Sequence, residues 1–140
     1  MTASNDKFRA MLIRHEGMRL RAYRDSEGVW TIGIGRNIET RGLTEEEVYY
    51  LFDNDVLTHT IEAQKLPVFD KLDPVRQDVL ISMVFNMGLP RLLGFRKFLG
   101  ALEERDWPGA SREMLDSRWS SQVGNRAQEL AKMIRTGAYE

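Results

Sequence analysis

The 140-residue sequence predicts an α+β fold that is mostly helical and carries one small β-hairpin. Apolar residues recur at helical spacing over most of the chain, and only residues 18–34 follow a period of two, on both sides of the turn-forming run DSEG. A chain of this length fits one compact domain with its own apolar core. We therefore expect residues 1–140 to form a single domain.

The first expected elements are a helix and the hairpin. Potential capping residues at 4–6, followed by an apolar face, predict a helix over about 6–16 that Gly17 ends. Alternation begins at Met18, and a tight turn over 25–28 connects this strand to a second one over 29–34. Such a turn makes the two strands antiparallel.

Two longer helices follow. Thr44 precedes three glutamates, which predicts an N-cap for a helix that runs toward Lys65. About 20 residues at 1.5 Å each would span about 30 Å, enough for a rod that joins two lobes. Asp73 is the expected cap of the next helix, with Pro74 in its first turn, and the apolar residues up to Gly88 make this the predicted core helix.

Short helical segments are expected in the C-terminal part, because glycine, proline and small polar residues interrupt the helical period there. Large aromatic residues at helical positions pack in cores more often than they bind ligands, so we expect Trp107 and Trp119 in the core and leave Trp30 as a possible platform for a sugar ring. The segments are 90–94, 95–105, 108–117 and 125–136, with breaks at Gly94, at Trp107-Pro108-Gly109 and at the SSQVGN loop.

Composition excludes several classes of site. The chain has no cysteine for disulfides, thiolate ligands or nucleophilic catalysis, and with only His15 and His59 a zinc site is not expected. A net charge of -1 provides no field to attract nucleic acid. No segment has the pattern of a secretory signal or a membrane span, so we expect synthesis in a cytoplasm, no membrane insertion and no cofactor.

The charge is unevenly distributed along the chain. Residues 1–36 carry seven basic and four acidic side chains, residues 37–66 carry two and seven, and residues 67–140 carry eleven and ten. The basic excess therefore coincides with the first helix and the hairpin. Chance scatter on a solvated surface and steering of an acidic substrate are both compatible with this pattern.

Glu16 and Asp25 are the candidate catalytic carboxyl groups. Cleavage of a glycosidic bond needs a carboxylic acid that protonates the leaving oxygen and a carboxylate that attacks or activates water. The negative end of a helix favours the protonated form of Glu16, whereas a polar turn keeps Asp25 charged. These environments assign Glu16 as the acid, although the spacing alone also fits two solvated surface charges.

The run E-G-x-R-L-x-x-Y-x-D-x-x-G-x-x-T-I-G-I-G, from Glu16 to Gly35, resembles the catalytic segment of the phage-type lysozymes, the T-even bacteriophage lysozyme family or glycoside hydrolase family 24. The resemblance covers nearly the whole chain. It implies an endolysin: a muramidase that hydrolyses the β-1,4 bond between N-acetylmuramic acid and N-acetylglucosamine in peptidoglycan, for host cell lysis. Further matching segments, in the family's order, are LFDNDV, LDPVRQDVLISMVFNMG, GFRKFL, SRWSSQVGNRAQ and IRTGAY.

The resemblance also implies an arrangement. A small β-containing lobe with the long helix would comprise 17–65, a helical lobe would comprise 1–16 and 66–140, and the active-site cleft would lie between them. By position, Glu16 is similar to the family's general acid, Asp25 to the carboxylate that activates water, and Thr31 to the hydroxyl that holds this water. The enzymes it resembles invert the anomeric carbon, which requires carboxyl groups roughly 6.5 to 9.5 Å apart.

Four further positions match residues around the family's site. Arg126 is similar to an arginine that pairs with the catalytic glutamate. Phe85 and Asn86 match a Phe-Gln pair at the cleft, where the amide binds sugar, although asparagine is one methylene shorter. Gly33, together with Gly35, is expected to allow close approach of the backbone, either in strand packing or to substrate.

The sequence departs from the family after TIGIG, where the family usually has a histidine that pairs with an aspartate on the long helix. Arg36 stands at the histidine's position and Asp55 matches the aspartate, so we predict an Arg36–Asp55 ion pair. A guanidinium stays charged, and the pair should not titrate near neutrality. The segment between Arg36 and the long helix is also shorter than in the T-even enzyme, which predicts a smaller β lobe.

Two alternatives stay open. A lytic transglycosylase needs a glutamate but no catalytic aspartate, so Asp25 and Thr31 argue against it. A non-catalytic helical module would bind peptidoglycan without cleaving it. For the muramidase, we expect a monomer acting on glycan strands, made in the host cytoplasm and released by a separate holin to the cell wall in the periplasm.

Overall fold

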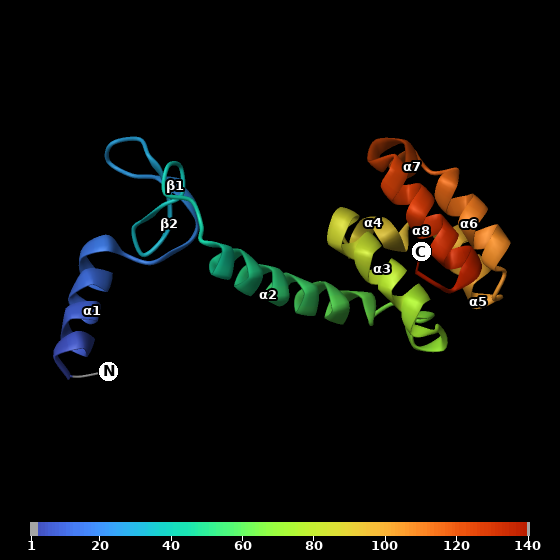
Figure 1. Ribbon diagram of the computed structural model, residues 1–140, viewed down its shortest axis with the longest axis horizontal. Coiled ribbons are helices and arrows are strands. Elements are labelled where there is room, and N and C mark those ends of the chain that lie inside the picture. The colour runs from blue at the N-terminus through green and yellow to red at the C-terminus, as the bar shows by residue number, and fades with distance from the viewer. Residues whose placement is uncertain (1–2, 140) are drawn as a thin grey trace. The chain divides into compact units, whose positions relative to one another are not determined.

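The computed structural model describes residues 3–139 and confirms the α+β class (Figure 1). Eight α-helices and one three-stranded sheet lie within the described residues. The chain divides into two compact units, Met1–Tyr50 and Leu51–Glu140, and this boundary falls inside one helix. The predicted boundaries of the two lobes, and the cleft between them, stay predictions. No helix in the described part is both long and apolar enough to cross a membrane.

The first unit contains a helix followed by an antiparallel sheet in the order β1-β2-β3. The helix and hairpin were predicted, whereas β3 was not, because two residues are too few to show alternation. The elements are α1 (Ala3–Glu16), β1 (Arg19–Arg24), β2 (Trp30–Gly33) and β3 (Arg36–Asn37).

Helix α2 (Glu45–Ala63) begins as the sequence predicts. The Thr44 hydroxyl accepts a hydrogen bond from the Glu47 backbone N–H at 3.2 Å, and the Glu47 carboxylate accepts one from the Thr44 N–H at 2.8 Å. This reciprocal pair is a capping box, which satisfies two backbone donors at the start of the helix. The N-cap therefore fixes where the sheet-bearing segment ends and α2 begins.

The second unit is helical throughout. The short helices are present as predicted, but the Trp107-Pro108-Gly109 segment starts a helix instead of breaking one, because the Asp106 carboxylate accepts a hydrogen bond from the Gly109 N–H at 3.0 Å. The SSQVGN segment likewise contributes to a helix that was predicted as a loop. The elements are η1 (Phe69–Lys71), α3 (Pro74–Met87), α4 (Leu89–Leu93), α5 (Arg96–Glu103), α6 (Trp107–Leu115), α7 (Arg118–Val123) and α8 (Asn125–Thr136).

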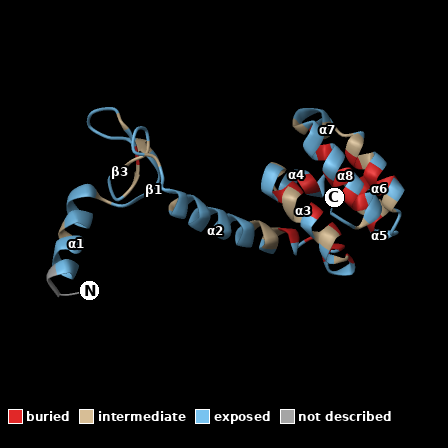
Figure 2. Cartoon of the chain, viewed as in Figure 1, coloured by how far each residue is buried: buried red, intermediate tan, exposed pale blue. Residues whose placement is uncertain are grey.

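Helix α3 is the centre of this unit's core, as predicted. Val79, Leu80 and Met83 are fully buried, and the buried positions concentrate on the facing sides of α3, α6 and α8 (Figure 2). Asp73 caps α3 and Pro74 occupies its first turn. Trp119 is buried, which confirms it as a core residue, and Trp107 packs half-buried against the same core.

One buried cation ties together the ends of three helices of this unit. Arg76, at the start of α3, donates from Nε to the Ile134 carbonyl at 2.7 Å and from Nη1 to Asp73 at 2.9 Å. Its guanidinium lies 3.8 Å from the centre of the Trp107 ring. Burial alone would raise the pKa of Asp73, but the hydrogen bonds from Arg76 hold it below its ordinary value.

Replacement of this cation should destabilise the fold strongly. We expect Arg76→Met to lower the free energy of unfolding by about 2–4 kcal/mol, because it leaves the Ile134 carbonyl without its donor and Asp73 without its counter-charge. Urea unfolding followed by circular dichroism measures the change. Arg112→Met, at an exposed position on α6, is the control and should cost less than about 0.5 kcal/mol. Equal losses in the two variants would contradict the role of Arg76.

Candidate active site

Glu16 is the last residue of α1, where the sequence places it. Gly17 follows with a φ of 78° and donates its N–H to the Ile13 carbonyl at 2.8 Å, so a left-handed residue ends the helix. The Glu16 side chain then lies against the backbone of Gly35: a Cβ atom added at Gly35 would stand 2.5 Å from Glu16 Oε2. The close approach that glycine permits at Gly35 is therefore to the candidate acid itself.

Asp25 forms the hairpin turn with its own side chain. Its Oδ1 accepts hydrogen bonds from the backbone N–H groups of Glu27 at 2.8 Å and Val29 at 2.9 Å, while its own N–H donates to the Val29 carbonyl at 2.9 Å. The predicted tight turn is present, and the carboxylate is held in place by backbone groups. Within residues 3–139 no hydrogen bond reaches Oδ2, so this oxygen is able to accept a hydrogen bond from solvent.

Thr31 is buried in β2, the central strand of the sheet, with 4% of its surface exposed. Its hydroxyl donates to the Val29 carbonyl at 2.9 Å, so its oxygen lone pairs stay able to accept a hydrogen bond from water. Val29 therefore holds both Asp25 and Thr31, through its N–H and its carbonyl respectively. Sequence reasoning missed Val29, because a backbone contribution leaves no signal in the side chain.

Gly33 lies in β2, opposite the start of β1. It pairs with Arg19 in the sheet and has a φ of 70°, a conformation that favours glycine. A Cβ atom added at Gly33 would meet nothing within 4 Å, so close packing between strands does not explain it. The backbone conformation explains this glycine, and its contact with substrate stays a prediction.

Arg36 pairs with Glu47 in the structure, and its predicted pairing with Asp55 stays a prediction. The Arg36 guanidinium makes a bidentate contact with the Glu47 carboxylate, with Nη1 and Oε1 2.9 Å apart, and also donates to the Gly42 carbonyl at 3.0 Å. Asp55 lies eight residues further along α2, about 12 Å along the axis at 1.5 Å per residue.

This pair changes the acidity of both partners. The hydrogen bonds from Arg36, together with the backbone hydrogen bond from Thr44, lower the pKa of Glu47 from 4.5 to about 2. The same contact raises the pKa of Arg36. Glu47 therefore joins the capping box of α2 to β3 through one ionised carboxylate.

Three predicted residues lie in the helical unit. The Phe85 ring packs edge-on against His59 at 4.8 Å between ring centres. The Asn86 Oδ1 accepts a hydrogen bond from the buried Trp119 Nε1 at 2.7 Å, so part of this side chain is committed to the core. Arg126 donates from Nη2 to Ser82, at 3.2 Å to the carbonyl and 3.1 Å to the hydroxyl. The pairing of Arg126 with Glu16 stays a prediction.

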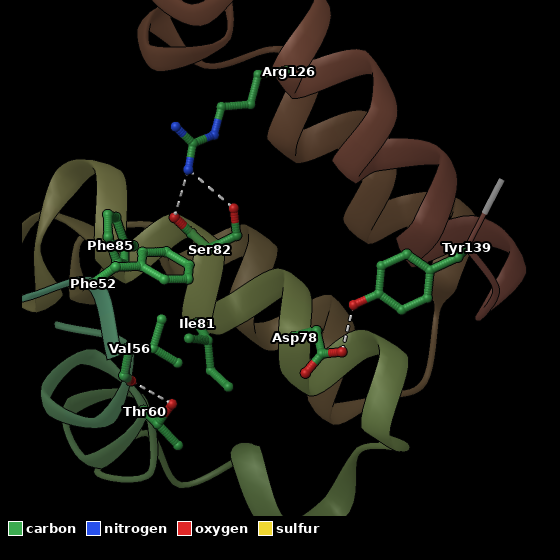
Figure 3. Close-up of a pocket in the computed structure, with 9 residues that line it drawn as sticks. All are labelled: Phe52, Val56, Thr60, Asp78, Ile81, Ser82, Phe85, Arg126 and Tyr139. Atoms are coloured by element: carbon green, nitrogen blue, oxygen red, sulfur yellow. Dashed lines mark hydrogen bonds between the residues drawn. The ribbon is translucent and has the colours of Figure 1, made fainter. Parts of the chain in front are cut away.

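Phe85 and Arg126 line one pocket of about 520 Å³, and Asn86 is not among its lining residues (Figure 3). Phe52 and Phe85 line an apolar side of this pocket, and Ser82 and Arg126 line a polar side. Tyr139 donates its hydroxyl to Asp78 at 2.5 Å on the same pocket, and this hydrogen bond raises the pKa of Tyr139. Across residues 3–139, no cluster of three or more His, Cys, Asp or Glu side chains has the arrangement of a metal site.

Comparison with known proteins decides the family. The model of the phage lysozyme family matches residues 13–136, which include Glu16, Asp25, Thr31 and Arg126. The chain belongs to the phage lysozyme family. The predicted resemblance is thereby confirmed, and membership implies a glycoside hydrolase of the lysozyme type with peptidoglycan as its substrate.

Three relatives of this member of the phage lysozyme family come from different organisms. "Probable T4-type lysozyme 1" of Dictyostelium discoideum is 31% identical in an alignment 157 positions long, which covers 91% of this chain and 92% of the relative. "Pre-baseplate central spike protein Gp5" of Enterobacteria phage T4 is 32% identical in an alignment 159 positions long, which covers 93% of this chain and 28% of that protein. "Endolysin" of Acyrthosiphon pisum secondary endosymbiont phage 1 is 26% identical, covering 94% and 90%.

The absence of a side chain at Gly35 should be essential for the position of Glu16, the candidate acid. We expect Gly35→Ala to displace the Glu16 carboxyl group and to lower lytic activity at least tenfold, because the new methyl group would overlap Oε2. Gly42→Ala is the matched control: its φ of 63° imposes the same backbone strain, about 1–2 kcal/mol, but its Cβ would meet nothing within 4 Å. Turbidity clearing of bacterial cells and thermal unfolding separate the two effects. Similar activity in both variants would contradict the role assigned to Gly35.

The Arg36–Glu47 pair should make stability depend on acid pH. Because the pKa of Glu47 is lowered to about 2, its contribution is complete above pH 4.5 and is lost as the pH falls toward 2. We expect Glu47→Gln to lower the melting temperature at pH 6 and to have a progressively smaller effect at pH 4 and pH 3. Glu45→Gln, in the same first turn of α2, is the control, because it removes a carboxylate and leaves the Arg36–Glu47 pair in place. A Glu47→Gln difference that stays constant from pH 6 to pH 3 would exclude this linkage.

Proposed function

We propose that this member of the phage lysozyme family hydrolyses the β-1,4 glycosidic bond between N-acetylmuramic acid and N-acetylglucosamine, with inversion at the anomeric carbon. The observation that carries the proposal is the hairpin site. At one end of the hairpin, the Glu16 carboxyl group lies at the end of a helix, against Gly35. At its turn, the Asp25 carboxylate and the Thr31 hydroxyl both form hydrogen bonds with the backbone of Val29.

Each group has one role in the proposed reaction. Glu16, in its protonated form, donates a proton to the leaving glycosidic oxygen as the bond to the anomeric carbon breaks. Asp25 Oδ2 takes a proton from the attacking water, whose oxygen forms the new bond on the opposite face of the sugar. The Thr31 oxygen accepts the second hydrogen of this water. Because Oδ1 is held by two backbone N–H groups, Asp25 needs no rearrangement to act.

We further propose that the enzyme lyses the host from within. Similarity to endolysins of phages supports this role. On this proposal the chain is a monomer made in the host cytoplasm, and a separate holin releases it to the cell wall in the periplasm.

The match to the central spike protein of phage T4 favours a second role, in which the chain opens the wall as part of a phage particle. The two roles differ in where the protein is found. An endolysin is released into the lysate, whereas a spike component remains with purified particles after sedimentation.

Loss of the acid tests the mechanism directly. We expect Glu16→Gln to reduce clearing of outer-membrane-permeabilised Gram-negative cells by about 10²- to 10⁴-fold, since general acid catalysis is removed. Asp25→Asn should cause a comparable loss while it keeps the carbonyl oxygen that accepts the turn hydrogen bonds. Glu27→Gln, in the same turn, is the control and should clear cells like the native protein.

Product analysis then separates the mechanisms. Proton NMR of the first products should show the α-anomer, as inversion requires. The β-anomer would overturn the inverting mechanism, and anhydro-sugar ends would identify a lytic transglycosylase. Undiminished clearing by Glu16→Gln would refute the assignment of the acid.

A further inference from the structure

The middle of β1 forms a hollow at the edge of the sheet. Arg19 pairs with Gly33 and Tyr23 pairs with Thr31, so three residues of β1 lie opposite one residue of β2. Extra residues of this kind bend a strand and turn its side chains away from the ladder. The hollow measures about 480 Å³ and is lined by Arg19, Leu20, Arg21, Ala22 and Tyr23.

This strand is basic over its whole length. Three of the six residues of β1 are arginines and none is acidic. The Arg19 guanidinium lies 4.6 Å from the Tyr23 ring centre, and the Arg24 guanidinium lies 4.4 Å from that of Trp30. Stacking on a ring face orients a guanidinium and leaves its N–H edge able to bind an anion. Arg21 is exposed within the same hollow.

The basic strand also connects the two candidate catalytic carboxyl groups. It begins three residues after Glu16 and ends at the residue before Asp25. A substrate that reaches both carboxyl groups therefore passes close to β1. Arg24 donates from Nη1 to the Gly28 carbonyl at 3.0 Å and so supports the hairpin turn. The sugar backbone of peptidoglycan is neutral, and recognition of the sugars alone gives Arg19 and Arg21 no role.

We propose that Arg19 and Arg21 bind the carboxylate groups of the stem peptides that peptidoglycan carries on its muramic acid residues. This inference rests on the proposed function, because it places those peptides beside the hairpin. Guanidinium groups match carboxylates in planar, bidentate geometry. The basic excess of the hairpin then has a specific ligand, the anionic part of the substrate.

Binding to purified Gram-negative sacculi tests the proposal. One sample keeps its stem-peptide carboxylates, and in the other they are converted to neutral amides. Co-sedimentation uses the full-length Glu16→Gln protein, so that the sacculi stay intact. In this background we expect Arg19→Gln/Arg21→Gln to raise the dissociation constant for the untreated sacculi about tenfold, as the loss of two exposed charge-assisted contacts predicts.

The control removes the same net charge elsewhere. Lys7→Gln/Arg41→Gln, at two exposed positions outside β1, should leave the dissociation constant unchanged. Amidation should weaken binding of the Glu16→Gln protein about tenfold and abolish the difference between this protein and the β1 variant. Equal binding of the β1 variant and the control variant to untreated sacculi overturns the proposal. A difference between these variants that persists on amidated sacculi also overturns it, because the arginines would then bind phosphate or sugar.

A separate readout distinguishes this proposal from the proposed function. The native protein should release reducing ends from untreated sacculi. Failure to do so refutes hydrolysis, whereas the carboxylate-dependent binding of the Glu16→Gln protein reports on β1 alone.

Discussion

The contact between Glu16 and Gly35 is the constraint on which the candidate site depends. Helix α1 ends at Glu16, and the chain then makes a complete hairpin before it returns to place Gly35 against the same carboxyl group. The two ends of the hairpin therefore meet at this carboxyl group. Any side chain at Gly35 would push the acid away, so the position of Glu16 relative to Asp25 and Thr31 is determined by a residue that has no functional group.

Backbone groups also determine the other half of the site. Asp25 and Thr31 are six residues apart, and the peptide groups of Val29 bind both of them. The carboxylate that forms the turn is the same one that we assign to water activation. A change that damages the turn would therefore damage catalysis, whereas Asp25→Asn removes the charge and keeps the oxygen that accepts the turn hydrogen bonds.

The sequence predicts most elements here because their signals are local. Capping at Thr44 and Asp73, the period of α3 and the turn at Asp25 depend on residues a few positions apart, and all are present. The partner of Arg36 depends instead on which turn of α2 lies near β3, and position matching pointed to Asp55 where Glu47 binds. Helix α7 was missed because its serine cap and polar residues also suit a loop. The contact of Gly35 with Glu16 joins residues nineteen positions apart, and only coordinates show it.

The buried Arg76 has a consequence for how the chain is made. Its acceptors include the carbonyl groups of Ile134 and Arg135, which lie 58 and 59 residues further along the chain. During synthesis, α3 leaves the ribosome with a guanidinium whose acceptors have not yet been translated. The helical unit therefore cannot close around this charge until the end of α8 has been synthesised, and a nascent chain that stops before α8 lacks the finished core.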